Sequence, residues 1–526
     1  MNQTLIEKKL FEKRREQSLT LFRKSINYFT LILFFTQIIL NLNFENVICN
    51  LICVTIIFQT NYEVINVRNR SIDSALIAVL VYLIIICNSL MPMMGTVIEG
   101  NELIFSLKNP IEVFSHRYFF GLVLLVAFKL THRNKSSSLY ILFNKLGSLF
   151  ETRKLVSIQT LWALGFLGIM PLLLRNIISN IILIKFIEGF GFLIWAPFLL
   201  LITPYSNIRS KSDKLGLIIF MAIMLAISII VNSRMAIVGP IATILCAWLI
   251  TLLMGYANIS QASIKKGALI GISSIFVLGQ ISDLSTAILI ERAYRYNRTA
   301  DEQLSITFDT YLNKEKIAEF SKSEKNLDSV LKSDGEWQEN YIRNPFLARL
   351  TQIKYDDNCF ERIKTFTPEK KVKLEEITVD KLLSNFPSPV LDFLNINVDK
   401  KYSISFSVGD IIDVLSGKGF LGGLKTGSVI AHAFVIFSWS YLLILLIIYY
   451  IIFTAFQGLV TFTKFEVNDS SLPFSTLGLF ICFKLFTDIS LDGITSPVGF
   501  LFRGIWQLMF IYFVAIKLVF VFDKKK

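Results

Sequence analysis

One charged stretch, from about Asp283 to Lys425, interrupts a chain that is otherwise hydrophobic from end to end. The rest of the sequence holds about a dozen apolar segments, most of them near the roughly 20 residues that a helix needs to cross a bilayer. This pattern predicts an all-α polytopic membrane protein. The predicted protein has about 12 transmembrane helices and one large, partly helical extracytoplasmic loop.

The composition agrees with this fold class. The chain has 526 residues, of which 53% are hydrophobic and 18% charged, and its mean hydropathy is +0.57. Soluble domains are about 45–50% apolar and about 25% charged. The formal net charge is +13, but much of the Lys and Arg flanks apolar segments. That distribution is typical of membrane topology and contact with lipid headgroups, and we expect no nucleic-acid partner.

Twelve segments are predicted to span the membrane, and two of them, 46–60 and 473–489, are short for a span. The twelve segments are 26–43, 46–60, 73–93, 114–130, 155–174, 178–203, 215–232, 235–256, 267–283, 427–454, 473–489 and 499–521. The predicted organisation is a basic N-terminus over 1–25, a membrane domain over 26–283, a loop over 284–426, a second membrane part over 427–521 and a tail over 522–526. Segment 136–151 is too short to span and is predicted to lie on the inner membrane surface.

The orientation follows from the positive charge. With the N-terminus inside, the short connections richest in Lys and Arg all lie inside, and so does the tail Lys524–Lys526. This satisfies the positive-inside rule and places both termini in the cytoplasm and the large loop outside the plasma (inner) membrane. The basic N-terminus has no small-residue cleavage site after it, so it is expected to be a retained signal anchor.

The loop is predicted to contain two helices. The first continues the ninth apolar segment over 283–298, where Arg292, Arg295 and Arg298 repeat every three residues along one flank. These three arginines are candidates for substrate binding.

The second loop helix is predicted over 344–363. There Asn344 can cap the helix and Pro345 suits its first turn, and Arg349 is a further candidate for substrate binding. The polar stretch 313–336 between the two helices is expected to be mobile. The loop closes with a glycine-rich run over 416–428.

Charged residues inside apolar segments are expensive and are therefore candidates for function. Lys185 and Glu188 lie three residues apart, Lys484 and Asp488 lie four apart, and Arg503 lies near the outer end of the last segment. Two readings stay open for these charges. They either pair to hold helices together and reach out to the interface, or they line a polar cavity that opens outward, in which Lys484 and Arg503 bind substrate.

Two single residues are candidates for catalysis. Arg234, in the short outside connection "NSRMAIVGP", can grip a phosphate with both arms of its guanidinium, although an interfacial Arg also reaches into water without such a role. His432, in "TGSVIAHAF" after the glycine-rich run, can act as a base or hydrogen-bond a phosphate, or it can simply be packed. His116 is a weaker candidate, and His132 is expected to be solvated.

No motif indicates a metal or a cofactor. The six cysteines form no CxxC pair, and the outside histidines lack clustered carboxylates. No dinucleotide-binding, Walker or nucleophile-elbow pattern occurs where its context would require one. We therefore expect no cofactor, and nucleotide-driven transport is disfavoured.

The layout resembles the bacterial O-antigen polymerase and O-antigen ligase superfamily. "NSRMAIVGPIATILCAWLI" is similar to the family region that carries an arginine, at Arg234, and "GFLGGLKTGSVIAHAF" is similar to the glycine-rich approach to a histidine, at His432. In ligases, Asn, Ser or Gln usually follows the histidine, with glycines one helical stretch later. Here Ala433 follows and "VIFSWSYLLI" has no glycine, which favours the polymerases.

The resemblance implies glycosyl transfer at the outer face of the plasma membrane. An undecaprenyl-diphosphate-linked repeat would be the donor, a sugar hydroxyl on another lipid-linked repeat the acceptor, and the product O-antigen, capsule or exopolysaccharide. Arg234 would stabilise the leaving diphosphate, together with Arg295 or Arg298. His432 would position the diphosphate or take the acceptor proton, with Glu291, Asp410 or Asp413 as alternative bases.

The implied partners are membrane lipid, the lipid-linked donor and acceptor, a chain-length regulator and a flippase. Three other functions stay open: an O-antigen ligase, a lipid-linked oligosaccharide flippase or transporter, and a membrane scaffold. A flippase is expected to show related halves and short loops, and this sequence shows neither.

Overall fold

The computed structural model is all-helical over the residues that it describes, among which no strand occurs. The described residues are 2–65, 74–134, 136–150, 152, 156–174, 187–202, 205, 209–230, 235–257, 259–260, 262–263, 279–280, 282–284, 286–288, 290–291, 299–325, 337–344, 347–348, 351–386, 388–423, 425–460, 477–478, 480–482, 485 and 492–523. The all-α part of the predicted fold class is therefore confirmed for these residues.

The helices fall into an apolar set and a set from the hydrophilic part of the chain. The first set is α1 Asn2–Leu40, α2 Phe44–Ile65, α3 Ala75–Ile98, α4 Pro110–Arg133, α5 Ser138–Leu149, α6 Ile158–Leu174, η3 Gly189–Leu201, α9 Lys211–Ile230, α10 Met235–Met254, α21 Val429–Phe437, η5 Ser438–Ser440, α22 Tyr441–Val460, α24 Thr495–Gly499, η6 Phe500–Gly504 and α25 Ile505–Asp523. The second set is α12 Ala300–Leu312, α13 Lys314–Lys325, α16 Ile353–Ile363, α17 Pro368–Leu383, α18 Ser388–Phe393, α19 Lys400–Ser405 and α20 Val408–Leu415.

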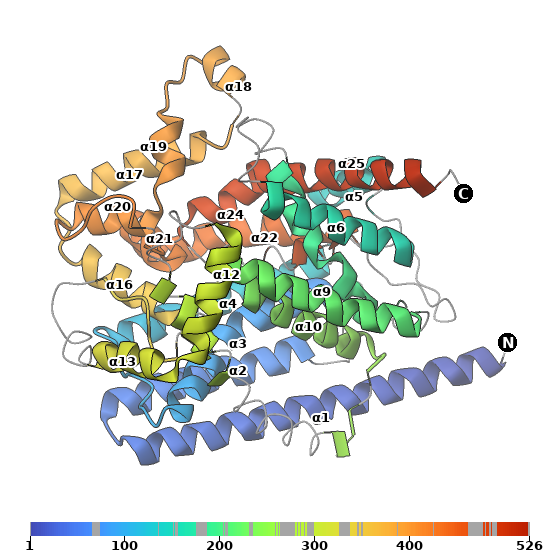
Figure 1. Cartoon of the computed structure of the whole chain (residues 1–526), viewed down its shortest axis with the longest axis horizontal. Coiled ribbons are helices and arrows are strands. Elements are labelled where there is room, and N and C mark those ends of the chain that lie inside the picture. Colours follow the sequence, from blue (N-terminus) through green and yellow to red (C-terminus); the bar gives the residue numbers. More distant parts are fainter. Residues whose placement is uncertain are drawn as a thin grey trace.

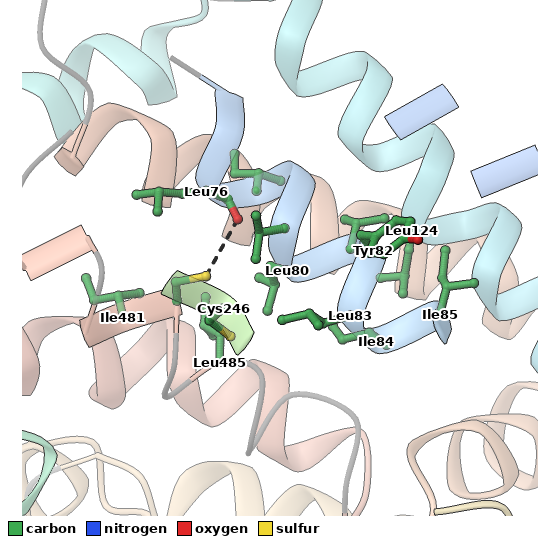
Figure 2. Packing of buried hydrophobic residues seen from close by; sticks show 14 of the residues in the cluster. Leu76, Leu80, Tyr82, Leu83, Ile84, Ile85, Leu124, Cys246, Ile481 and Leu485 are labelled. Atoms are coloured by element: carbon green, nitrogen blue, oxygen red, sulfur yellow. Dashed lines mark hydrogen bonds between the residues drawn. The ribbon is translucent and has the colours of Figure 1, made fainter. Parts of the chain in front are cut away.

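The core is built around α3. Its sequence has no charged residue and is apolar on all sides, and 20 of its 24 residues are buried. A helix that is hydrophobic all round packs on every face, and α3 contacts α1, α2, α4 and α10. Figure 2 shows Leu76, Leu80 and Leu83 of α3 facing Cys246 of α10 and Leu485, while Cys482 donates a weak hydrogen bond to the Leu76 carbonyl.

Among the described residues, five helical stretches are long and apolar enough to cross a membrane. Three are the helices α2, α3 and α4, and the other two are Val429–Leu459 and Thr495–Val519. Shorter apolar helices cover Ile158–Leu174, Gly189–Leu201 and Thr243–Met254. The segment 46–60, which was predicted to be short for a span, lies within a helix of 22 residues. These helices are consistent with a membrane protein; most of 267–283 and 473–489 lies outside the described residues.

Several helices of the hydrophilic part gather on one side of the molecule, where ends of the apolar helices also lie (Figure 1). The N-terminal end of α1 and the C-terminal end of α25 lie at the right of the view, while α13, α16, α17 and α20 lie at the left. The helix α1 runs without a break through the boundary predicted at residue 25. At 39 residues it is about 58 Å long, about twice the thickness of a bilayer's hydrocarbon core.

The structure adds detail to two predicted parts of the loop. The helix predicted over 344–363 is interrupted at Gln352, where φ is +52°, so α16 begins only at Ile353. The expected Asn344 cap is confirmed, because its side chain accepts a hydrogen bond from the Leu347 N–H at 3.0 Å. Within the stretch 313–336, which was expected to be mobile, Lys314–Lys325 forms the helix α13.

The tenth predicted span is also divided. Ser438 has φ 48° and ψ −145°, which ends α21 and separates it from α22 by the short helix η5. The short segment predicted over 136–151 forms α5. It packs so closely on α22 that a Cβ at Gly458 would lie 2.8 Å from the Tyr140 carbonyl oxygen.

Candidate functional site

His432 lies in the first turn of α21, where Ser428 caps the helix by accepting a hydrogen bond from the Ala431 N–H at 3.0 Å. The imidazole is fully buried, and both ring nitrogens have partners. Nδ1 lies 3.3 Å from the Ile494 N–H and Nε2 lies 2.8 Å from Thr378 Oγ1. The ring therefore joins three segments that are distant in the sequence.

The partners of His432 define its protonation. The Thr378 hydroxyl donates to the Leu374 carbonyl at 2.7 Å, so its oxygen can only accept from Nε2. Nδ1 in turn accepts from the Ile494 amide. We assign the neutral tautomer with its proton on Nε2. In this arrangement His432 holds α17, α21 and the segment before α24 together, and no ring nitrogen is left for a substrate.

The chain before α24 passes very close to this ring. An added Cβ at Gly493 would lie 2.6 Å from His432 Nδ1, and one at Gly427 would lie 2.0 Å from the Asp492 carbonyl oxygen. Both distances are far below normal contact, so only glycine allows these backbones to cross here. The glycine-rich run therefore places the start of α21 directly against residues 492–494.

Six charged residues surround this crossing, and we call them the charged cluster. They are Arg362 of α16, Lys381 of α17, Asp410 and Asp413 of α20, Lys425 of the glycine-rich run, and Asp492. Three are basic and three acidic, and a further carboxylate lies beside them, because Glu339 accepts a hydrogen bond from the Thr426 N–H at 2.6 Å. Buried charges are tolerated when they are paired in this way.

Asp413 is the centre of one half of the charged cluster. Its Oδ1 lies 2.7 Å from Arg362 Nε in an ion pair that lacks the alignment of a hydrogen bond, and its Oδ2 pairs with Lys425 Nζ. The side chain of Asp413 is 1% exposed, that of Arg362 is 4% exposed, and that of Lys425 is 15% exposed. The Lys425 ammonium also lies 5.1 Å from the ring centre of Phe420. Of the three residues in these ion pairs, Lys425 is therefore the one most exposed to solvent.

Lys381 and Asp492 belong to the other half of the charged cluster. Lys381 Nζ donates to the carbonyls of Ser403 and Phe406 at 2.7 and 2.6 Å, and burial lowers its pKa while the nearby carboxylates oppose that shift. Asp492 accepts a hydrogen bond from the Val408 N–H at 2.8 Å, and burial raises the pKa of its carboxyl above the usual value. Asp410 accepts from the Lys425 N–H at 3.1 Å.

A second polar group lies on the other side of α16. Arg117 of α4 pairs with Asp356, and both are buried. His116 hydrogen-bonds the Tyr441 hydroxyl at 2.8 Å and stacks between Phe360 and Trp439, at 4.8 and 5.0 Å between ring centres. Because α16 carries both Asp356 and Arg362, it connects this group with the charged cluster.

The structure brings some of the predicted site residues together. His432, Asp410 and Asp413 lie in one place, and Arg503 is exposed on η6. Glu291 lies elsewhere, accepting hydrogen bonds from Thr310 and Lys316 at 2.7 Å each. The remaining predicted residues lie outside the described part of the chain; they are Arg234, Arg292, Arg295, Arg298, Arg349 and Lys484.

Five members of the site were not found from the sequence: Thr378, Arg362, Lys381, Lys425 and Asp492. Three of them lie on polar helices of the loop, where burial depends on the tertiary fold. For Asp492 one signal existed, since it precedes a glycine in "LDGITS", a pattern typical of a tight turn. Its φ is indeed +70°. Among the described residues no group of His, Cys, Asp and Glu is arranged to hold a metal ion.

The chain was compared with known proteins in three ways. No protein-family model, no curated protein and no solved structure matches it.

Proposed function

We propose that this protein polymerises undecaprenyl-diphosphate-linked oligosaccharide repeats into a surface polysaccharide by glycosyl transfer. The proposal rests on the resemblance of the segments around Arg234 and His432 to the O-antigen polymerase and ligase superfamily. It includes the full topology of about 12 spans, with both termini cytoplasmic and the loop outside the bacterial plasma membrane.

The position of Lys425 supports this proposal in addition to the sequence likeness. Lys425 lies on the glycine-rich run that leads to His432, and it is the member of the Asp413 ion-pair network that meets solvent. The span Val429–Leu459 begins four residues after Lys425. A lipid whose tail lies along such a span presents its diphosphate at the end of that span, within reach of a cation in this position.

Glycosyl transfer from a lipid diphosphate requires cations near the diphosphate. In the transfer, the bond between the sugar C1 and the diphosphate oxygen breaks, and the acceptor hydroxyl oxygen forms the new glycosidic bond. Negative charge then builds up on the leaving diphosphate, and a positioned cation stabilises it. We assign this task to Lys425 together with Arg234, and the acceptor proton leaves to a base that we do not assign.

The role of His432 is refined by its contacts. Because both ring nitrogens are occupied, His432 is a positioning residue in this conformation. It holds α21 against α17 and the 492–494 segment, and so fixes the path of the glycine-rich run that carries Lys425. Loss of the imidazole would displace Lys425 without removing a group that touches substrate.

The experiment is a gel of surface glycans from the host with this gene deleted and then complemented. We expect the deletion to abolish the ladder while single repeats still reach the surface, and wild type to restore it. Arg234→Lys keeps the charge but loses the two-armed grip, so a bidentate phosphate role predicts short chains. Unchanged chain lengths in the deletion strain would overturn the assignment, and repeats trapped on lipid inside the cell would indicate a transporter.

A further inference from the structure

Among the described residues of the hydrophilic part, the helix α18 carries the most exposed large apolar side chain. Its Phe393 is 85% exposed, and Leu394, directly after the helix, is 55% exposed. In Figure 1, α18 stands apart at the top of the view, beyond α17 and α19. We call residues 388–399 the α18 tip. Exposed apolar side chains that gather at one place are a feature of protein and membrane interaction sites.

The base of the α18 tip lies against a candidate membrane span. Phe386, two residues before α18, packs on Phe502 of η6 with 5.3 Å between ring centres. Asn385 contacts the same turn, since a Cβ at Gly499 would lie 3.0 Å from its Oδ1. The tip therefore extends from the N-terminal end of the span Thr495–Val519.

That span has an exposed aromatic strip. Phe502, Trp506 and Phe510 recur every four residues, so they lie on one helical face, and they are 55%, 42% and 54% exposed. An exposed strip of this kind on an apolar span faces lipid, and aromatic and arginine side chains gather where a span meets the membrane surface. Arg503 is exposed in the same turn as Phe502. The α18 tip continues this strip beyond the end of the span.

The charge and size of the tip indicate which partner it meets. Residues 388–399 contain Asp392 and Asp399 and no Lys or Arg, although Lys400 and Lys401 follow directly, so the formal charge of the tip itself does not favour anionic surfaces. A stable protein interface buries about 800 Å² on each partner, which a helix of six residues with two prominent apolar side chains does not offer. Shallow insertion into lipid requires only those side chains.

We propose that the α18 tip inserts Phe393 and Leu394 into the bilayer interface beside the span Thr495–Val519. The partner is a neutral phospholipid surface, and insertion is driven by burial of apolar side chains. The tip then sets the depth of α17, which carries Thr378 and Lys381 to His432 and the charged cluster. This inference does not depend on the transferase activity.

The test places a fluorescent label at the tip. The six native cysteines are all buried, so Phe393→Cys can be labelled with an environment-sensitive dye in the full-length protein, with unlabelled wild type as background. The protein is reconstituted in phosphatidylcholine nanodiscs. Lys373→Cys, on the exposed face of α17, is the matched control. Leu394→Cys is a second tip position, in case the first variant perturbs the tip.

We expect lipid-borne nitroxide to quench both tip labels at least twofold more than the control, and aqueous iodide to quench them at least twofold less. Replacing half of the phosphatidylcholine by an anionic lipid should not increase the lipid quenching. Tip labels that iodide quenches as strongly as the control would show that the tip lies in water. Labels shielded from both quenchers would show that protein covers the tip. Either result would overturn the inference.

Discussion

Thr378 Oγ1 lies 2.8 Å from Nε2 of His432, and this contact joins the loop helix α17 to the first turn of α21. Both residues are buried, and the Thr378 hydroxyl donates a hydrogen bond to the Leu374 carbonyl. The imidazole is therefore held from both sides, by α17 and by the Ile494 amide. The position of the glycine-rich run depends on this chain of hydrogen bonds.

Replacing the threonine tests this dependence. Thr378→Val keeps the shape but leaves the buried Nε2–H without an acceptor, which costs about 1–3 kcal/mol of unfolding free energy. Thr378→Ser keeps the hydroxyl and is expected to lose about 1 kcal/mol or less, from the missing methyl. Denaturation in mixed detergent micelles measures both values. Equal losses for Val and Ser would show that the hydrogen bond does not hold the site.

The ion pairs of Asp413 give a second prediction. Asp413→Asn leaves Arg362 and Lys425 without their carboxylate, and loss of one partner from a buried pair costs about 3–5 kcal/mol. In Asp413→Asn, the buried Arg362 has lost its carboxylate partner. The double variant Arg362→Leu with Asp413→Leu removes both charges of that pair, so it is expected to be more stable than Asp413→Asn. Asp380→Asn, on the exposed face of α17, is the matched control and should change stability by about 0.5 kcal/mol or less. A double variant less stable than Asp413→Asn would contradict this account.

The folded state is expected to respond to pH through Asp492. Burial raises the pKa of this carboxyl above its unfolded value, close to 3.8, although Lys381 partly opposes the shift and Asp410 adds to it. The folded protein then holds a proton that the unfolded chain releases, so this contribution to stability is present at low pH and is lost as pH rises through the raised pKa.

Asp492→Asn removes that titration and keeps an oxygen for the Val408 N–H. The unfolding free energy of the variant, relative to wild type, should therefore be higher at pH 7 than at pH 4. Detergent unfolding at the two pH values measures the difference. A variant that gains nothing between pH 4 and pH 7 would show that the carboxyl titrates normally in the folded protein.

The break between α21 and α22 is strained. Ser438 adopts φ 48° and ψ −145°, a conformation that is open to glycine and costs other residues about 1–3 kcal/mol. Its side chain is exposed, so Ser438→Gly is expected to raise the unfolding free energy by about 1 kcal/mol or more. Ser440→Gly, two residues on, has no such strain to relieve and is expected to destabilise. If both variants destabilise equally, the backbone at 438 is not under strain.

The sequence predicted the apolar helices better than it predicted the site. The helix α3 was predictable because its sequence is apolar and has no charged residue, so hydropathy alone marks it. In the structure 20 of its 24 residues are buried. His432 was singled out by the glycine-rich run before it, and the close crossing at Gly427 and Gly493 gives the physical reason for part of that run.

The rest of the site depends on tertiary contacts. Lys381 lies in "PEKKVKLEEITVDKLL", where Lys371 and Lys373 are exposed and nothing local marks the buried lysine. Its burial comes from the carbonyls of Ser403 and Phe406, more than 20 residues away in sequence. Likewise, the break at Gln352 needs a positive φ that Gln adopts rarely, so helical periodicity predicted a continuous helix there.

The most direct test of the proposed function is polymerisation by the purified protein in proteoliposomes that contain an undecaprenyl-diphosphate-linked repeat. The chain length of the product is measured for wild type, for Lys425→Met and for the control Lys373→Met. We predict polymers of several repeats and release of undecaprenyl diphosphate with wild type and Lys373→Met, and at least a tenfold lower rate with Lys425→Met. Failure of wild type to extend the repeat would contradict the proposed reaction, and equal rates for Lys425→Met and wild type would contradict the proposed site.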